Sequence, residues 1–135
     1  MVPSKPSTVY PMSGDMNKDP GVWARQILAN PKLTHSKYAA VCTEVITLGE
    51  ALSQWANISG KKGVYVEVKP EVIGQMYGIA GEEAVTGVLF GEAVKDWFGH
   101  VKEKGLFVTK EQLGISMDEV SDFKKSLESV KQFLG

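Results

Sequence analysis

Two carboxylates stand one helical turn apart in a segment that is otherwise mostly apolar. Glu92 and Asp96 share the face of a predicted helix with Val85 and Leu89. Apolar surroundings disfavour the charged form of a carboxylate and raise its pKa, so one of the two is a candidate general acid or base. Alternatively, both side chains face solvent at the edge of the helix, near Lys95.

A histidine follows the same predicted helix and is the third candidate for proton transfer. The helix dipole favours a protonated ring at His100, which would then act as an acid at the mouth of a pocket. The alternative is that this residue caps the C-terminal end of the helix. Cys42, His35 and His100 lack the spacing of metal ligands, so no metal site is predicted.

The interior of the same helix carries two glycines and large apolar side chains. Gly87 and Gly91 lie one turn apart, and each glycine in a helix interior costs about 1 kcal/mol relative to alanine. Either another backbone packs closely there or a ligand fills the space. Apolar side chains around a few polar groups predict a small-molecule pocket, although each of them alone also suits an ordinary core. The predicted substrate-binding residues are Met12, Met76, Tyr77, Phe90, Trp97 and Phe98.

Composition places these residues in one ordinary globular domain. The chain has 135 residues, 43% of them apolar and 23% charged, and its net charge of -1 favours no nucleic-acid partner. Cys42 is the only cysteine, so no internal disulfide forms and a reducing cytoplasm is predicted. No apolar run reaches the roughly 20 residues that span a bilayer, so no membrane partner is expected.

Caps and prolines predict where the elements begin and end. Residues 1–18 form a proline-rich extended arm, and residues 19–135 form the domain. Asp19 as N-cap and Pro20 as first helical residue predict a helix to about Asn30. Thr47 and Glu50 predict a capping box at the start of the next helix.

The second half of the chain is predicted to be largely helical. Gly78 ends a short helix that begins at Pro70, and a longer helix over 81–98 is apolar enough to be buried on more than one side. Ser116 and Glu119 form a second predicted capping box, followed by an amphipathic helix to Leu134.

Two segments predict strands, 38–45 and 64–68. A helix joins them, which favours a parallel pair. Two strands make a weak sheet, so a third strand is expected from the arm or from a partner chain. The predicted fold class is helix-rich α/β, with a small parallel two- or three-stranded sheet packed with about five helices.

Three segments between roughly residues 10 and 100 follow the order and spacing of a known pattern. The first contains Pro11, Met12, Asp19–Trp23 and Gln26–Leu28; the second, Lys37, Tyr38, Glu44–Thr47 and Glu50; the third, Gly60–Lys62, Val64–Val66, Val68, Pro70 and Glu71. Together they resemble the C-terminal, substrate-side half of NmrA-like proteins, which are atypical relatives of the short-chain dehydrogenases.

The resemblance implies that half's fold and a substrate pocket, without its nucleotide-binding partner domain. The family's dinucleotide fingerprint and catalytic-region lysine have no match in this chain, so no cofactor and no catalytic residue carry over. The predicted function is a cofactor-independent cyclase, isomerase or lyase that acts on an apolar secondary metabolite. Because loss of a partner domain would uncover apolar surface, a homodimer is expected.

Two other functions stay open. The first is a non-catalytic module that binds a metabolite or a regulatory partner protein, a role known within the NmrA-like family. The second is that the chain is a fragment of a longer NAD(P)-dependent reductase.

Overall fold

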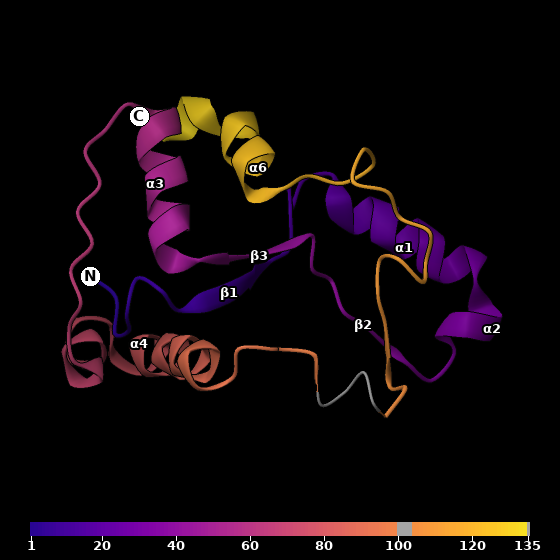
Figure 1. Ribbon diagram of the computed structural model, residues 1–135, viewed down its shortest axis with the longest axis horizontal. Helices are drawn as coiled ribbons and strands as arrows, with labels where there is room; N and C mark the ends of the chain where they lie inside the picture. The colour runs from indigo at the N-terminus through magenta and orange to yellow at the C-terminus, as the bar shows by residue number, and fades with distance from the viewer. Residues whose placement is uncertain (100–103, 135) are drawn as a thin grey trace. The chain divides into compact units, whose positions relative to one another are not determined.

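A computed structural model describes residues 1–99 and 104–134, and the chain folds as two compact units (Figure 1). The first unit comprises Met1–Tyr10 and Ile46–Lys95. The second unit comprises Pro11–Val45 and Asp96–Gly135. The predicted arm, residues 1–18, is therefore divided between the two units.

The first unit contains helix α3, Leu48–Ser59, which begins at the predicted capping box. The Thr47 hydroxyl accepts the Glu50 N–H, and the Glu50 carboxylate accepts the Thr47 N–H at 2.8 Å. These reciprocal bonds satisfy backbone donors that a helix start leaves unpaired. Gly60 ends α3 with a φ of 70°, in the left-handed region that glycine adopts readily.

The first unit also contains α4, Pro70–Ala93, which is broken at Gly78 as its sequence predicts. The backbone there has φ 61° and ψ -145°, and the chain reverses so that the two halves of α4 pack together. A methyl group at Gly81 would lie 2.6 Å from the Ile73 carbonyl oxygen. Only glycine permits this close approach, so Gly78 and Gly81 together make the helical hairpin.

Replacing Gly78 by alanine is expected to lower the free energy of unfolding by about 1–3 kcal/mol, because its backbone conformation is nearly exclusive to glycine. Urea denaturation followed by circular dichroism measures the change. Gly21→Ala, where an added methyl group meets no atom within 4 Å, is the matched control and should be neutral or slightly stabilising. Equal losses in the two variants would contradict the conformational explanation.

Two predictions for the second half of α4 are wrong. The helix ends at Ala93 and does not continue to Phe98. The predicted burial of this helix on more than one side is also wrong. Among the described residues of α4, only Ile73, Gly81, Val85 and Gly91 are buried. Ile79 is 83% exposed. The helical hairpin covers one side only, which leaves much of this apolar helix uncovered.

The second unit is organised around α1, Asp19–Ala29, and the short helix α2, Pro31–Thr34. Asp19 is the first residue of α1, whereas the sequence predicts it as the N-cap. The helix therefore begins one residue earlier than predicted. Trp23 packs into the core of this unit, which is completed by Val108, Leu113, Ile115 and Val120.

The C-terminal part of the second unit begins its helix later than predicted. Ser116 and Glu119 do bond, with the Glu119 carboxylate accepting the Ser116 N–H at 3.2 Å, but they close a turn and not a helix. Helix α6, Phe123–Ser129, begins after Asp122, whose carboxylate accepts the Lys125 N–H. A 3-10 helix, Lys131–Phe133, follows. Val120 is buried in the core from the irregular segment before α6, and not from a helix as predicted.

The strands pair differently from the prediction. Segment 38–45 splits into β2, Tyr38–Ala39, and β3, Glu44–Thr47. β2 pairs in parallel with β4, Phe107–Val108, with Tyr38 opposite Phe107. β3 pairs with β1, Val9–Met12, so the arm does supply a strand (Figure 1). Segment 64–68 forms only an isolated bridge, between Glu67 and Val2.

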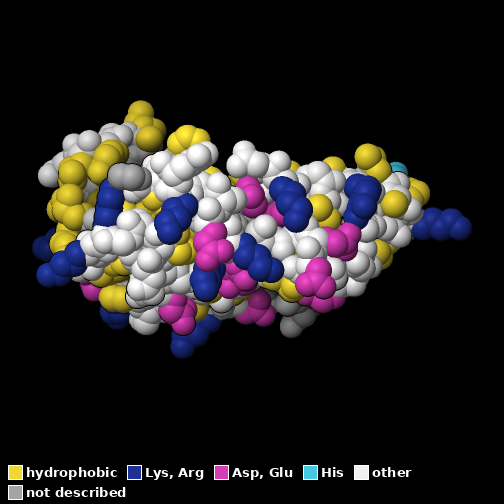
Figure 2. Space-filling view, turned by 90° about the horizontal axis from the view of Figure 1, so that it is seen from above, with side chains coloured by type: hydrophobic (Ala, Val, Ile, Leu, Met, Phe, Trp, Pro, Cys, Tyr) yellow, Lys and Arg dark blue, Asp and Glu magenta, His cyan; other side chains and the backbone are white. Residues whose placement is uncertain are grey.

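The helix-rich α/β class with small sheets, one of them parallel, is confirmed. Within the described ranges, no helix combines the length and apolar character needed to cross a bilayer. Acidic and basic side chains intermingle on the face drawn in Figure 2, which therefore shows no extended patch of one charge.

Candidate functional site

The predicted site residues fall into both compact units. The first unit holds Met76, Tyr77, Phe90 and Glu92, and the second holds Met12, Asp96, Trp97 and Phe98. His100 lies outside the described residues. The candidate functional site therefore consists of residues from the first unit alone.

The predicted helical pair of carboxylates does not form. Because α4 ends at Ala93, Asp96 does not lie one turn further along it, and its carboxylate accepts the Phe98 N–H at 3.2 Å. Glu92 stays on α4, where its carboxylate lies 3.7 Å from Lys5 Nζ of the arm. Phe98 contacts Phe107 in the second unit, with ring centroids 6.2 Å apart.

A cavity of about 410 Å³ lies between the start of the arm and α4, and we call it the apolar cavity. Tyr77 is the one predicted substrate-binding residue in its lining, while the exposed side chains of Met76 and Phe90 are not part of it. Its lining residues are Met1, Val2, Pro3, Ile73, Tyr77, Ala80, Gly81, Ala84, Val85 and Val88.

Backbone hydrogen bonds hold the arm against the rest of the first unit. Val2 donates its N–H to the Val66 carbonyl and accepts the Val68 N–H, at 2.9 and 3.0 Å. The Tyr65 phenol donates to the Ser4 carbonyl at 3.0 Å. Burial raises the pKa of Tyr65, so its phenol stays protonated and able to donate this bond. The arm is thereby fixed as a wall of the apolar cavity.

A second cavity of about 400 Å³ lies further along the same arm and the same helix, and we call it the polar cavity. Next to it, the Gly49 N–H donates to the Pro6 carbonyl at 2.8 Å and the Leu48 N–H to the Thr8 carbonyl at 3.0 Å. These bonds fix the arm at the start of α3. The residues that line the polar cavity are Lys5, Ser7, Thr8, Val9, Gly91, Glu92 and Lys95.

Gly87 and Gly91 of α4, the pair that the sequence singles out, have different surroundings. A methyl group at Gly87 would lie 3.6 Å from the Tyr10 hydroxyl, so this glycine faces a side chain. Gly91 is buried and lines the polar cavity.

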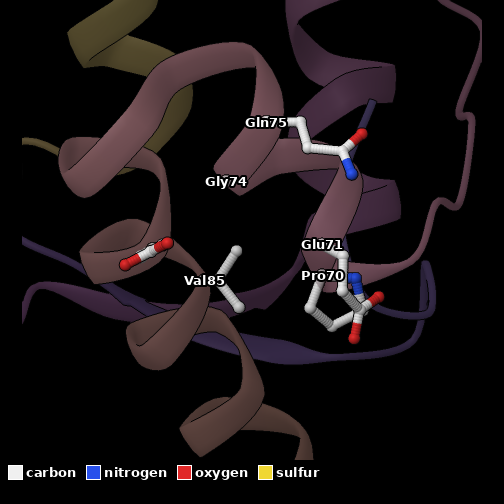
Figure 3. A pocket seen from close by; sticks show the side chains of 6 residues that line it. Pro70, Glu71, Gly74, Gln75 and Val85 are labelled. Atoms are coloured by element: carbon white, nitrogen blue, oxygen red, sulfur yellow. The ribbon is translucent and has the colours of Figure 1, made fainter.

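A third cavity, of about 470 Å³, lies between the two halves of α4 (Figure 3). Glu71 and Glu82 contribute carboxylates, and Gln75 an amide. The remaining lining residues are Pro70, Gly74 and Val85. No basic side chain offsets the two carboxylates within this lining, and no group of acidic, cysteine or histidine side chains in the described ranges is arranged to hold a metal ion.

No protein-family model, curated protein or solved structure matches this chain. The resemblance to NmrA-like proteins accordingly rests on the three sequence segments alone.

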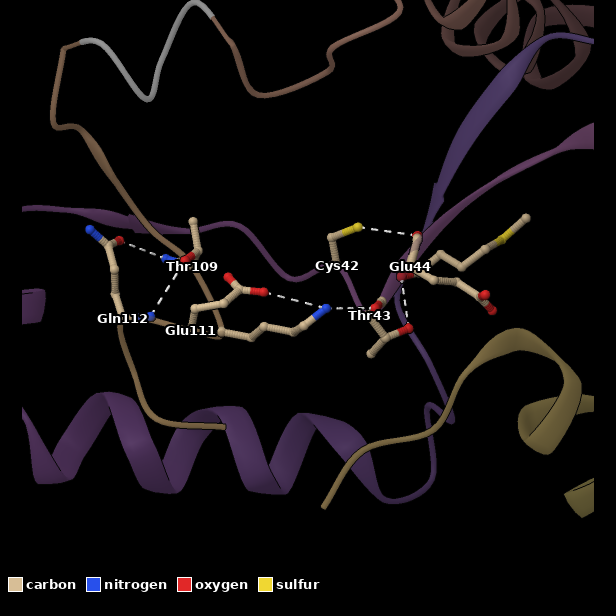
Figure 4. A network of polar contacts seen from close by, with 8 residues as sticks. Cys42, Thr43, Glu44, Thr109, Glu111 and Gln112 are labelled. Atoms are coloured by element: carbon tan, nitrogen blue, oxygen red, sulfur yellow. Dashed lines mark hydrogen bonds and ion pairs between the residues drawn. The ribbon is translucent and has the colours of Figure 1, made fainter. Parts of the chain in front are cut away.

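The lone cysteine belongs to a polar network in the second unit (Figure 4). Cys42 lies between β2 and β3 and not within a strand, and its thiol donates to the Glu44 carbonyl. Burial raises the pKa of the Cys42 thiol, which keeps it protonated and a poor nucleophile. Nearby, the Lys110 ammonium donates to the Thr43 carbonyl at 2.8 Å. This network joins segments of the second unit and offers no activated nucleophile.

The sequence did not predict that the arm forms a wall of the two cavities. Met1, Val2, Pro3, Lys5 and Thr8 line the cavities but belong to the segment predicted as an extended arm. Residues 1–8 show no regular alternation of apolar and polar residues that would have marked this wall. Pairing of the arm depends on contacts with distant residues, which local sequence patterns do not specify.

Proposed function

We propose that this protein binds a small apolar molecule in the apolar cavity and needs no nicotinamide cofactor to do so. The observation that carries the proposal is the lining of that cavity, where the Tyr77 phenol is the only side-chain oxygen or nitrogen group. A concave apolar surface with few polar groups is the usual form of a small-molecule site. The resemblance to the substrate-side half of NmrA-like proteins, without a dinucleotide turn, supports the same function.

Calorimetric titration with decanol and with NADPH tests this proposal. Decanol is expected to bind, because its chain offers apolar surface to the cavity, and NADPH is expected to give no binding heat. Absence of decanol binding, or tight binding of NADPH, would overturn the proposal.

A second candidate function is catalysis on the bound molecule, as a cyclase, isomerase or lyase of secondary metabolism. The observation that favours it is the position of Glu92 in the polar cavity, about one turn along α4 from Val88 of the apolar cavity. In an isomerisation, the Glu92 carboxylate would take a proton from one carbon of the ligand and return it to another. Orientation of a flexible molecule in the cavity would supply a further part of the rate enhancement.

Native mass spectrometry of the protein purified from its producing cells would identify a retained molecule, whose conversion can then be followed. Glu92→Gln should slow the conversion roughly 100-fold or more, since general acid–base catalysis contributes on that scale. Glu83→Gln is the control, because Glu83 is an exposed carboxylate of the same helix outside the cavity linings described. Full turnover by Glu92→Gln would end the catalytic candidate.

We also propose that the protein forms a homodimer in the cytoplasm, where its single thiol would stay reduced. Exposed apolar side chains on the first unit, including Met76, Ile79 and Phe90, support self-association. Light scattering at micromolar concentration is expected to give twice the mass of the chain, and Ile79→Glu should shift the protein toward the monomer. Lys62→Glu, at an exposed position of the same unit, serves as the control. A monomer at all concentrations would contradict the prediction.

A further inference from the structure

The apolar and polar cavities occupy successive positions along the same two segments of the first unit. The apolar cavity uses arm residues 1–3 and α4 up to Val88, and the polar cavity uses arm residues 5–9 and α4 from Gly91. On an α-helix, the step from Val88 to Gly91 is about one turn, or roughly 5 Å. One molecule could therefore extend from the first cavity into the second.

The charged groups of the polar cavity favour an anion. Lys5 and Lys95 contribute two positive charges to its lining, and Glu92 contributes one negative charge. The side chains of Lys5 and Glu92 are 67% and 35% exposed at a separation of 3.7 Å, so this pair is solvated and weak. Lys95 makes no ion pair with any residue in the described part of the chain. One positive charge in the lining is thus left without a counter-charge.

A buried hydroxyl in the same lining lacks a hydrogen-bond partner. Thr8 is only 4% exposed, and its Oγ1 meets no partner among the residues that the structure describes. A hydroxyl that is removed from water without a hydrogen-bond partner destabilises the fold. Valine has nearly the same shape and no hydroxyl, so it would be more stable at such a position. Because Thr8 Oγ1 is itself closed to water, the Thr8 side chain must turn about its Cα–Cβ bond toward the cavity before a ligand oxygen can supply the missing acceptor.

We infer that the ligand of this protein is an amphipathic carboxylate, with its apolar body in the apolar cavity and its carboxylate in the polar cavity near Lys95 and Thr8. This inference rests on the proposed function and adds the chemical class of the ligand. The carboxylate complements the unpaired positive charge and accepts from the hydroxyl, while the chain or ring system replaces water in the apolar cavity.

Titration with three molecules that share one chain tests the inference: decanoate, decanol and decylamine. At neutral pH and low salt, decanoate should bind roughly tenfold tighter than decanol, the difference expected for one charge-assisted hydrogen bond. Decylamine should bind more weakly than decanol, because the positive charge of Lys95 would repel its ammonium group. Added salt should weaken the binding of decanoate and leave that of decanol nearly unchanged.

Variants separate a ligand contact from a structural role. Lys95→Met and Thr8→Val should each remove most of the preference for decanoate, with little effect on decanol. Thr8→Val should also leave the free energy of unfolding unchanged or raise it, because it removes an unpartnered hydroxyl. Lys62→Met, an exposed lysine of the same unit outside the cavity, is the matched control and should keep the preference.

Equal affinities for the three molecules would overturn the carboxylate inference and leave the proposed function standing. Absence of binding by all three would overturn both. A preference for decanoate that persists unchanged in Lys95→Met and Thr8→Val would also overturn the inference, since the anion would then bind elsewhere.

Discussion

Asp19→Ala is expected to lower the free energy of unfolding by about 2–5 kcal/mol, because it leaves two backbone donors without an acceptor. Asp19 is completely buried in the second unit. Its Oδ2 accepts the N–H of Asp15 and the N–H of Ser121, each at 2.8 Å. One carboxylate oxygen thus ties the residues before α1 to the segment before α6, and alanine cannot replace it.

Urea denaturation, followed by tryptophan fluorescence, measures this loss. Asp19→Asn keeps one side-chain oxygen as an acceptor and should lose less than Asp19→Ala. Asp118→Ala, at an exposed position of the same unit, should change the free energy of unfolding by less than about 0.5 kcal/mol. If Asp19→Ala lowers the free energy of unfolding as little as Asp118→Ala does, the two N–H groups find other acceptors and the prediction is contradicted.

Ala84→Trp is expected to weaken decanol binding roughly 100-fold, because the indole would occupy the apolar cavity that the ligand must enter. Ala84 lines this cavity but is itself exposed, so the larger side chain need not disturb the core. Calorimetric titration gives the affinity, and circular dichroism checks that the helices are retained.

Ala93→Trp is the control for this change. Ala93 is an exposed alanine of the same helix and lies outside the lining of the apolar cavity. It should keep the affinity of the unmodified protein. Retained binding in Ala84→Trp, with a folded protein, would contradict the assignment of the ligand to this cavity.

Elements that depend on nearby residues could be predicted from the sequence. The capping box of Thr47 and Glu50 and the break at Gly78 are both present. Each is decided within a few residues, by side-chain acceptors or by a backbone conformation that only glycine tolerates. The helix predicted to begin at Pro20 is also present and begins one residue earlier, at Asp19.

Pairings between distant segments could not be predicted. Val64–Val68 has the composition of a strand but forms a single bridge with the arm. Ser116 and Glu119 form part of a capping box, but they close a turn and the helix starts only at Phe123. In both places the local pattern is present, but the strand or helix that it predicts also needs contacts with distant segments.

The candidate site was predicted in part. Tyr77 and Glu92 were predicted from their position near an apolar helix, and each lines a cavity of the first unit. Asp96 was placed on the same helix face because its spacing from Glu92 is one turn, but α4 ends before it. The arm residues were missed because their place beside α4 follows from hydrogen bonds to Val66 and Val68.

Amide NMR spectra recorded during titration with decanol test the central claim most directly, since they report where a small molecule binds. The largest shifts are expected at Val2, Tyr77 and Val88, which line the apolar cavity from the arm and from both halves of α4. Unchanged signals at these residues, or the largest shifts at Val108 and Val120 in the core of the second unit, would contradict the account.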